Sequence, residues 1–64
     1  MTPKWHVGKP CLVKLRGVDA WLPGRIVEMR GGKYGDPVVQ VTEGTFAGVT
    51  FIRGAHGARI VEAK

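Results

Sequence analysis

The residues able to do chemistry in this chain of 64 residues are few and widely spaced. Its single cysteine, Cys11, alternates with Val13 and Leu15, a pattern typical of a small buried hydrophobic side chain. His6 and His56 lie near opposite ends of the sequence, and no CxxC or HxxxH spacing accompanies them, so we expect no metal site. Covalent catalysis needs a nucleophile held next to a base, and no such pair is evident. The sequence favours a non-catalytic protein without a cofactor, although it does not decide the point.

Positive charge is the strongest signal in the composition. Ten Lys and Arg residues against five Asp and Glu residues give a net charge of +5. A small basic domain is a candidate for binding nucleic acid or another polyanion, because neutralising phosphates releases counterions. The alternative is that the charge only keeps a small protein in solution. Several cations occupy strand positions expected to face solvent, and one lies in a loop. We predict a nucleic-acid-binding set of Lys14, Arg16, Arg25, Lys33 and Arg53.

Short β-rich runs separated by turn residues indicate an all-β domain. Ten glycines and four prolines interrupt the chain, and no window carries a clear helical stripe. Strands spaced about ten to twelve residues apart are typical of a small barrel or sandwich. The run at residues 22–24 is expected to be a turn, and residues 54–57 have about the length of a 3₁₀ turn. The expected strands cover residues 11–16, 24–29, 38–42, 49–53 and 59–62.

The length of the chain leaves room for one domain. We expect residues 1–7 to form an N-terminal arm, unless Trp5 docks on the domain, and residues 8–64 to form the domain itself. Trp21 and Phe51 are expected in the core. A core this small is marginal without a disulfide or a metal, so self-association is a reasonable expectation. The unpaired cysteine, with no secretory leader and no apolar spanning run, predicts a cytoplasmic protein without a membrane partner.

Residues 8–15 and 21–27 resemble the opening of an SH3-like barrel, the fold shared by Tudor, PWWP-like and KOW modules. The shared pattern is a glycine before an alternating strand, a short loop, an aromatic residue, and a glycine that opens a second alternating strand. The resemblance covers roughly residues 8–62. It implies a single five-stranded SH3-like barrel with a short 3₁₀ turn before the last strand, and it says little about function.

The families that share this barrel imply different sites. Tudor-like readers hold a methylated lysine or arginine in an aromatic cage. Trp21, Tyr34 and Phe46 lie at or beside expected loops, so the alternative to a core position for Trp21 is a partial cage, in which these three are the predicted ligand or partner contacts. KOW-type modules bind RNA or polymerase partners through the loop after the first strand and neighbouring basic residues. For that reading, the basic set defined above is the expected contact surface.

A further resemblance is to the plasmid-borne, trimethoprim-resistant dihydrofolate reductases. Residues 20–27 and 48–52 carry it. Those small SH3-like chains assemble four subunits around one pore, where a Val-Gln-Ile-Tyr segment binds folate and NADPH and a lysine steers the ligands. The matching segment here is residues 49–52, and Lys14 matches the lysine. Thr50 and Ile52 replace the glutamine and the tyrosine, so the resemblance implies a ligand contact at Thr50 with altered chemistry.

Three functions therefore stay open. The leading prediction is a small basic binding module that contacts DNA, RNA or a nucleic-acid-associated protein complex through a basic face. The second is a protein–protein adaptor or a self-assembling accessory factor, with exposed Leu12, Leu22 or Phe46 as its contact patch. The third is an oligomeric protein related to the reductases, with altered pore residues.

Overall fold

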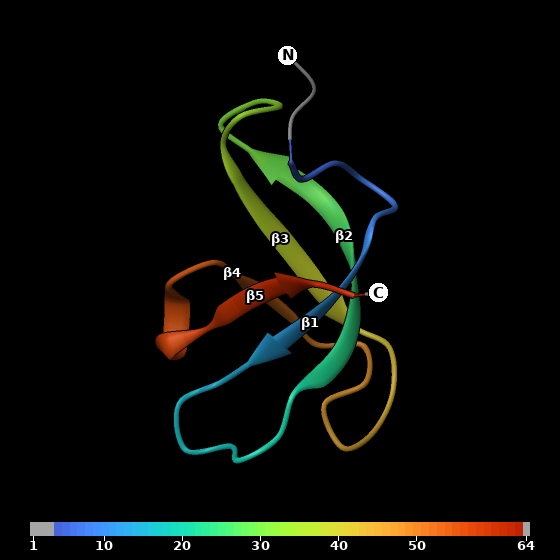
Figure 1. Ribbon diagram of the computed structural model, residues 1–64, viewed down its shortest axis with the longest axis vertical. Coiled ribbons are helices and arrows are strands. Elements are labelled where there is room, and N and C mark those ends of the chain that lie inside the picture. Colours follow the sequence, from blue (N-terminus) through green and yellow to red (C-terminus); the bar gives the residue numbers. More distant parts are fainter. Residues whose placement is uncertain (1–3, 64) are drawn as a thin grey trace.

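The computed structural model describes residues 4–63, which form an all-β chain with five antiparallel strands in one sheet (Figure 1). The strand order is β4-β3-β2-β1-β5, so the first four strands form a meander and the last returns to pair with the first. This confirms the prediction of five strands with one 3₁₀ turn, η1, before the last. The elements are β1 (Pro10–Lys14), β2 (Leu22–Arg30), β3 (Asp36–Val41), β4 (Thr50–Ile52), η1 (Ala55–Gly57) and β5 (Arg59–Glu62).

The strand ladder is open between β4 and β5, the two edge strands. Within residues 4–63 no ladder joins these strands, and η1 links them instead. The Gly54 N–H donates to the Ala58 carbonyl at 3.2 Å, and the Ala58 N–H donates to the Ala55 carbonyl at 2.9 Å. The closed barrel therefore stays a prediction. No helix in the described part of the chain is long and apolar enough to cross a membrane.

Strand β2 bends where its pairing with β3 shifts by one residue. Ile26 pairs with Val39, but Glu28 pairs with Val38. Val27 is therefore the extra residue of a β-bulge, which bends a strand and increases its twist. Figure 1 shows β2 curving as it passes from its pairing with β1 to its pairing with β3. The bend lets a single sheet enclose a core on its inner face.

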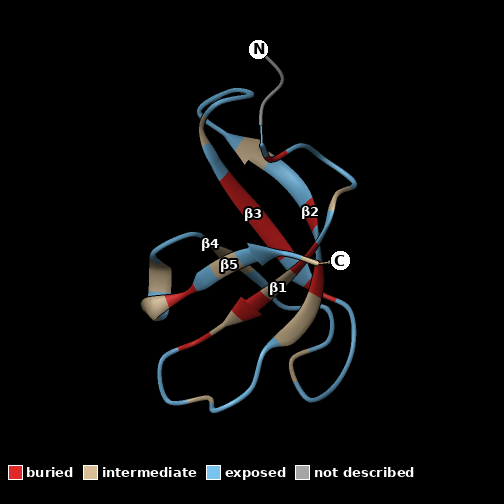
Figure 2. Cartoon of the chain, viewed as in Figure 1, coloured by how far each residue is buried: buried red, intermediate tan, exposed pale blue. Residues whose placement is uncertain are grey.

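The core is supplied mainly by alternate residues of β1, β2 and β3, where Figure 2 shows the buried segments in red. The predicted alternation is confirmed, since Cys11, Val13 and Leu15 are all buried. Gly24 is also buried, and a Cβ there would lie 2.6 Å from Cγ1 of Val39, so a side chain at this position would overpack the core. The buried cluster contains Trp5, Cys11, Val13, Leu15, Ile26, Val39, Val41 and Ala58.

Of the two tryptophans, Trp5 rather than Trp21 belongs to the core. The prediction of a core position for Trp21 is wrong, because this side chain is 44% exposed. Trp5 is only 6% exposed and belongs to the core cluster, while Phe51 is half-buried and packs against it. The Gly8 N–H donates to the Ile26 carbonyl at 2.8 Å, which ties the N-terminal segment to β2. Trp5 thus docks on the domain, so it is not part of a free N-terminal arm. Residues 1–3 of the expected arm, and residue 64, lie outside the described residues.

Strand β2 begins earlier than the sequence predicts, which explains the exposure of Trp21. Leu22 and Pro23 pair with β1 rather than forming a turn. Pro23 has no N–H to donate, but its carbonyl accepts from the Thr42 N–H at 3.0 Å, so it fits near the start of the strand. Counting back in twos from the buried Ile26 places Leu22 on the inner face and Trp21 on the outer face.

Candidate functional site

A row of polar and aromatic side chains crosses the outer face of the sheet at the end of β1. Lys14 of β1 pairs with Arg59 of β5. On the other side, the pairing of Val13 with Leu22, continued by one residue, places Trp21 opposite Lys14. Because Val13 is fully buried, its neighbour Lys14 faces outward. Two cations and an indole ring are therefore neighbours on one face of the sheet.

Arg16 joins this row from the loop that follows β1, where η1 holds it. Its backbone N–H donates to the carbonyl of His56 at 3.1 Å. Its side chain lies against Gly57, since a Cβ at that glycine would be 2.9 Å from Cβ of Arg16. Gly57 also has a φ of +70°, a conformation that glycine adopts at little cost. The 3₁₀ turn thus positions Arg16 through a backbone hydrogen bond and through the absence of a side chain.

These side chains line a cavity of about 660 Å³, which we call the larger cavity. In the described part of the chain, no carboxylate forms an ion pair with Lys14, Arg16 or Arg59. Like charges directly opposite each other destabilise the pairing of two strands. The larger cavity therefore concentrates positive charge that the fold leaves uncompensated. Its lining consists of Lys14, Leu15, Arg16, Gly17, Trp21, Gly57 and Arg59.

A smaller cavity, of about 210 Å³, lies near the other end of β2. Two of its three cations have acidic partners. Arg53 Nη2 lies 3.1 Å from Asp36 Oδ1, and Lys4 Nζ lies 3.9 Å from Glu62 Oε1. The smaller cavity therefore offers less uncompensated charge than the larger one. It is lined by Lys4, Trp5, Met29, Lys33, Tyr34, Gly35 and Arg53.

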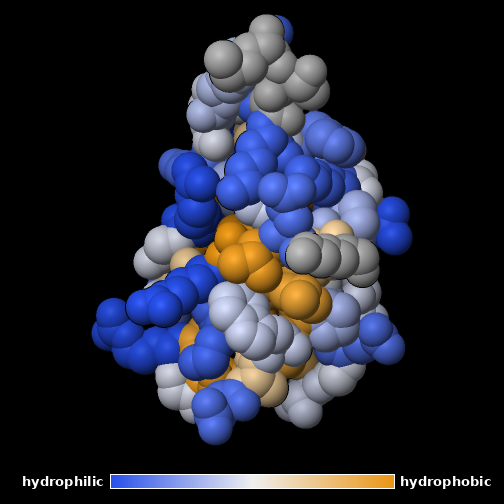
Figure 3. Space-filling model, in the orientation of Figure 1, coloured by the Kyte–Doolittle hydropathy of each residue, from blue (hydrophilic) through white to orange (hydrophobic). Residues whose placement is uncertain are grey.

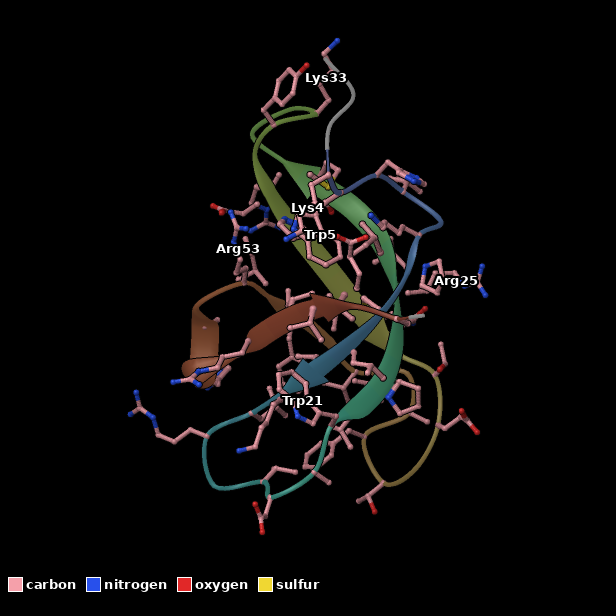
Figure 4. The ribbon with its side chains drawn as sticks, in the orientation of Figure 1. Lys4, Trp5, Trp21, Arg25, Lys33 and Arg53 are labelled. Carbon is pink, nitrogen blue, oxygen red and sulfur yellow. The ribbon has the colours of Figure 1, made fainter. Side chains whose placement is uncertain are left out.

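The structure divides the predicted nucleic-acid-binding residues into separate groups. Lys14 and Arg16 share the larger cavity, whereas Lys33 and Arg53 line the smaller one. Arg25 lines neither cavity and is exposed on β2. In Figure 4, Arg25 and Arg53 lie on opposite sides of the molecule, and Lys33 lies beyond them at the tip of the β2–β3 hairpin. Of these five predicted residues, only Lys14 and Arg16 lie together in one cavity without an acidic partner in the described chain.

The predicted aromatic and ligand contacts are also separated. Trp21 lines the larger cavity and Tyr34 the smaller one. Phe46 packs edge-on against Phe51, with their ring centroids 6.4 Å apart, and is half-buried against the core. Thr50 is exposed on the edge strand β4 and lines neither cavity. The rings of Trp21, Tyr34 and Phe46 therefore do not line a common cavity in the structure.

The residues of the other two functional alternatives are dispersed as well. Residues 49–52, the segment of the reductase resemblance, line neither cavity, while Lys14 lines the larger one. The single chain thus does not bring this lysine and this segment to one cavity. Of the expected adaptor patch, Leu22 and Phe46 pack against the core, which leaves Leu12 half-buried on the outer face.

Four lining residues of the larger cavity are absent from the predicted set: Leu15, Gly17, Gly57 and Arg59. Of these, Gly57 and Arg59 come from the C-terminal part of the chain. Their place depends on how β5 pairs with β1, a contact between the two ends of the chain that local spacing does not reveal. The available signal was an arginine at the start of the last expected strand. The opposed pair with Lys14 becomes evident only once the register is known.

Among residues 4–63, two titratable groups have shifted pKa values, and both lie outside the larger cavity. Desolvation by burial raises the pKa of the Cys11 thiol. A hydrogen bond from Lys9 and its positive charge lower the pKa of Glu62, with Lys9 Nζ 3.0 Å from Glu62 Oε2. Among residues 4–63, no three His, Cys, Asp or Glu side chains gather where they could hold a metal ion. What the larger cavity offers is cationic hydrogen-bond donors beside an aromatic face.

Comparisons of the chain with models of protein families, with curated proteins and with solved structures find no match. We accordingly infer a function from the larger cavity and its side chains.

Proposed function

We propose that this chain is a small non-catalytic binding domain of SH3-like barrel architecture that contacts nucleic acid through the larger cavity. The observation that carries the proposal is the cross-strand pair of Lys14 and Arg59, with Arg16 beside it and no carboxylate partner for any of the three in the described chain. The repulsion between these cations destabilises the fold of the free chain, and an anion bound in the cavity would replace that repulsion with attraction. A phosphate backbone supplies such anions at regular spacing.

The chemistry of the three cations suits phosphate. Each guanidinium of Arg16 and Arg59 presents planar donors that can bind two phosphate oxygens at once, and the Lys14 ammonium acts as a point charge. Three phosphate contacts release counterions, which is the main source of sequence-independent affinity for nucleic acid. The barrel architecture is supported by the single bent sheet, by the return of β5 to β1 and by η1 before β5.

The salt dependence of binding tests the proposal. Fluorescence anisotropy with a labelled oligonucleotide should show binding at low salt that weakens steeply as salt is raised. Replacing Lys14, Arg16 or Arg59 by Gln should each lower the slope of log K against log salt by about 0.7 for a single strand or about 0.9 for a duplex.

The matched control is Lys33→Gln, which removes the same charge from the smaller cavity. It should leave the slope nearly unchanged. Absence of binding at low salt would contradict the proposed function, and so would a slope that falls as much in Lys33→Gln as in Lys14→Gln.

A further inference from the structure

Trp21 is a large aromatic side chain that the fold leaves partly exposed. It is 44% exposed, whereas Trp5 fills the core. It lines the larger cavity with the cations, next to Lys14 in the outer row. Burying the ring of a tryptophan is among the larger favourable contributions available to a small domain. Since the fold leaves part of this ring exposed, that part of the indole is available to a ligand.

An apolar row lies next to the cationic row on the same face of the sheet. Leu12 of β1 pairs with Pro23 of β2 on one side and with Val61 of β5 on the other. Val61 is 41% exposed, and the other two are half-buried. Figure 3 shows an apolar surface, in orange, at the centre of the molecule where β5 crosses β1, with hydrophilic side chains around it. The cations of the larger cavity therefore border apolar surface.

We propose that the larger cavity binds single-stranded nucleic acid, with one unpaired base stacked on the indole of Trp21 and the adjoining phosphates at Lys14, Arg16 and Arg59. The inference rests on the proposed function and specifies its ligand. An unpaired nucleotide combines an apolar, planar base with a negative phosphate, which is the combination that this face presents. Stacking on an aromatic side chain tolerates any base, because every base has a π face.

A duplex fits this surface less well. Its bases are stacked inside, so Trp21 would meet sugars and phosphates rather than a base face. Reading a duplex also requires an element that enters a groove, such as a helix or a two-stranded ribbon. The cations and the ring instead line a hollow of about 660 Å³. A methylated lysine is disfavoured for a different reason, since three uncompensated cations would repel it.

The test compares strands of about a dozen nucleotides, within the roughly 4–16 nucleotides that one OB-fold covers. Oligothymidylate, oligouridylate and a DNA duplex of the same length are titrated against the wild-type chain at one salt concentration. The single strands should bind more tightly than the duplex and should change the fluorescence of Trp21. A purely electrostatic surface would instead favour the duplex, which has the higher charge density. The two single-strand arms distinguish DNA from RNA.

Substitution of the ring separates stacking from charge. Trp21→Leu should weaken single-strand binding roughly 5- to 150-fold while leaving the salt slope unchanged. Trp21→Phe, which keeps an aromatic face, should recover part of the loss. Tyr34→Leu removes an exposed ring from the smaller cavity and is the matched control, with no expected loss. Circular dichroism of each variant confirms that the sheet is intact.

The outcomes distinguish this inference from the proposed function. If the wild-type chain binds no oligonucleotide at low salt, both fail. If it binds the duplex as tightly as the single strands, or if Trp21→Leu binds single strands as the wild type does, the inference is wrong and the proposed function stands.

Discussion

The two tryptophans show how the same residue type serves the fold at one position and remains available at another. Trp5 is buried, and the ammonium groups of Lys4 and Lys9 lie 5.6 Å and 5.2 Å from the centroid of its ring. Glu62 of β5 pairs with both lysines. The contacts among these four residues hold the N-terminal segment against the last strand. Trp21 has no comparable set of contacts in the core and lies at the cavity instead.

At the residue scale, the lowered pKa of Glu62 predicts how pH affects the ion pairs that Glu62 forms with Lys4 and Lys9. Lys9 lowers the pKa of Glu62 in the folded chain, so the carboxylate stabilises the fold at pH values above its ordinary pKa of 4.5. This contribution is lost as the pH falls through the lowered folded value. Thermal unfolding followed by circular dichroism should therefore show that Glu62→Gln lowers the melting temperature at neutral pH and weakens the acid dependence.

The control is Glu43→Gln, which removes an exposed carboxylate that forms no ion pair in the described chain. Its melting temperature should follow that of the wild type across the same pH range. An acid dependence in Glu62→Gln identical to that of the wild type would show that the pair with Lys9 does not contribute.

The exposure of Trp21 could be predicted from the sequence, but the burial of Trp5 could not. Extending the second strand back to Leu22 puts Leu22 in register with Ile26 and sends Trp21 outward by alternation alone. The proline that follows Leu22 favoured a turn instead, and the prediction failed there. The N-terminal segment that carries Trp5 is held to the last strand by ion pairs from Lys4 and Lys9 to Glu62, which are long-range contacts. No local pattern reports such a contact.

At the scale of elements, the pairing of β1 with β5 creates the site. The alternation in the sequence fixes which face each strand buries, but not how one strand is aligned with another. A shift of one residue in β5 would turn Arg59 inward and remove the opposed cations. η1 lies next to this pairing, since only Ala58 separates it from β5 and its His56 carbonyl accepts from the Arg16 N–H. The strands were predictable from the sequence, whereas the site depends on the register between β1 and β5.

The opposed cations predict that binding and stability change in opposite directions. Arg59→Glu replaces a repulsive cross-strand pair with an attractive one, so we expect stabilisation by roughly 0.2–1 kcal/mol. For a domain of this size that corresponds to a rise in melting temperature of up to about 8 °C. The same substitution should weaken oligonucleotide binding by more than Arg59→Gln does. A loss of stability in Arg59→Glu, or unchanged binding, would contradict the role given to this pair.

At the scale of the whole molecule, charge compensation is uneven along an elongated shape. The described chain measures 34 × 20 × 18 Å, and the two cavities lie near opposite ends of β2. The ion pairs of the described chain involve Lys4, Lys9, Arg30 and Arg53. The end with the larger cavity keeps three cations without such partners. A net charge of +5 alone makes the chain a candidate for a polyanion partner, and the structure shows where its uncompensated cations gather.

The most direct test of this location is a nuclear magnetic resonance titration of the isotope-labelled chain with oligothymidylate at low salt. We expect the amide shifts to concentrate at residues 14–17 and 57–59, and we expect the indole N–H of Trp21 to shift with them. The smaller cavity should respond weakly. Shifts confined to residues 29–35 and Arg53, or no shifts at all, would contradict the claim that the larger cavity is the nucleic-acid contact.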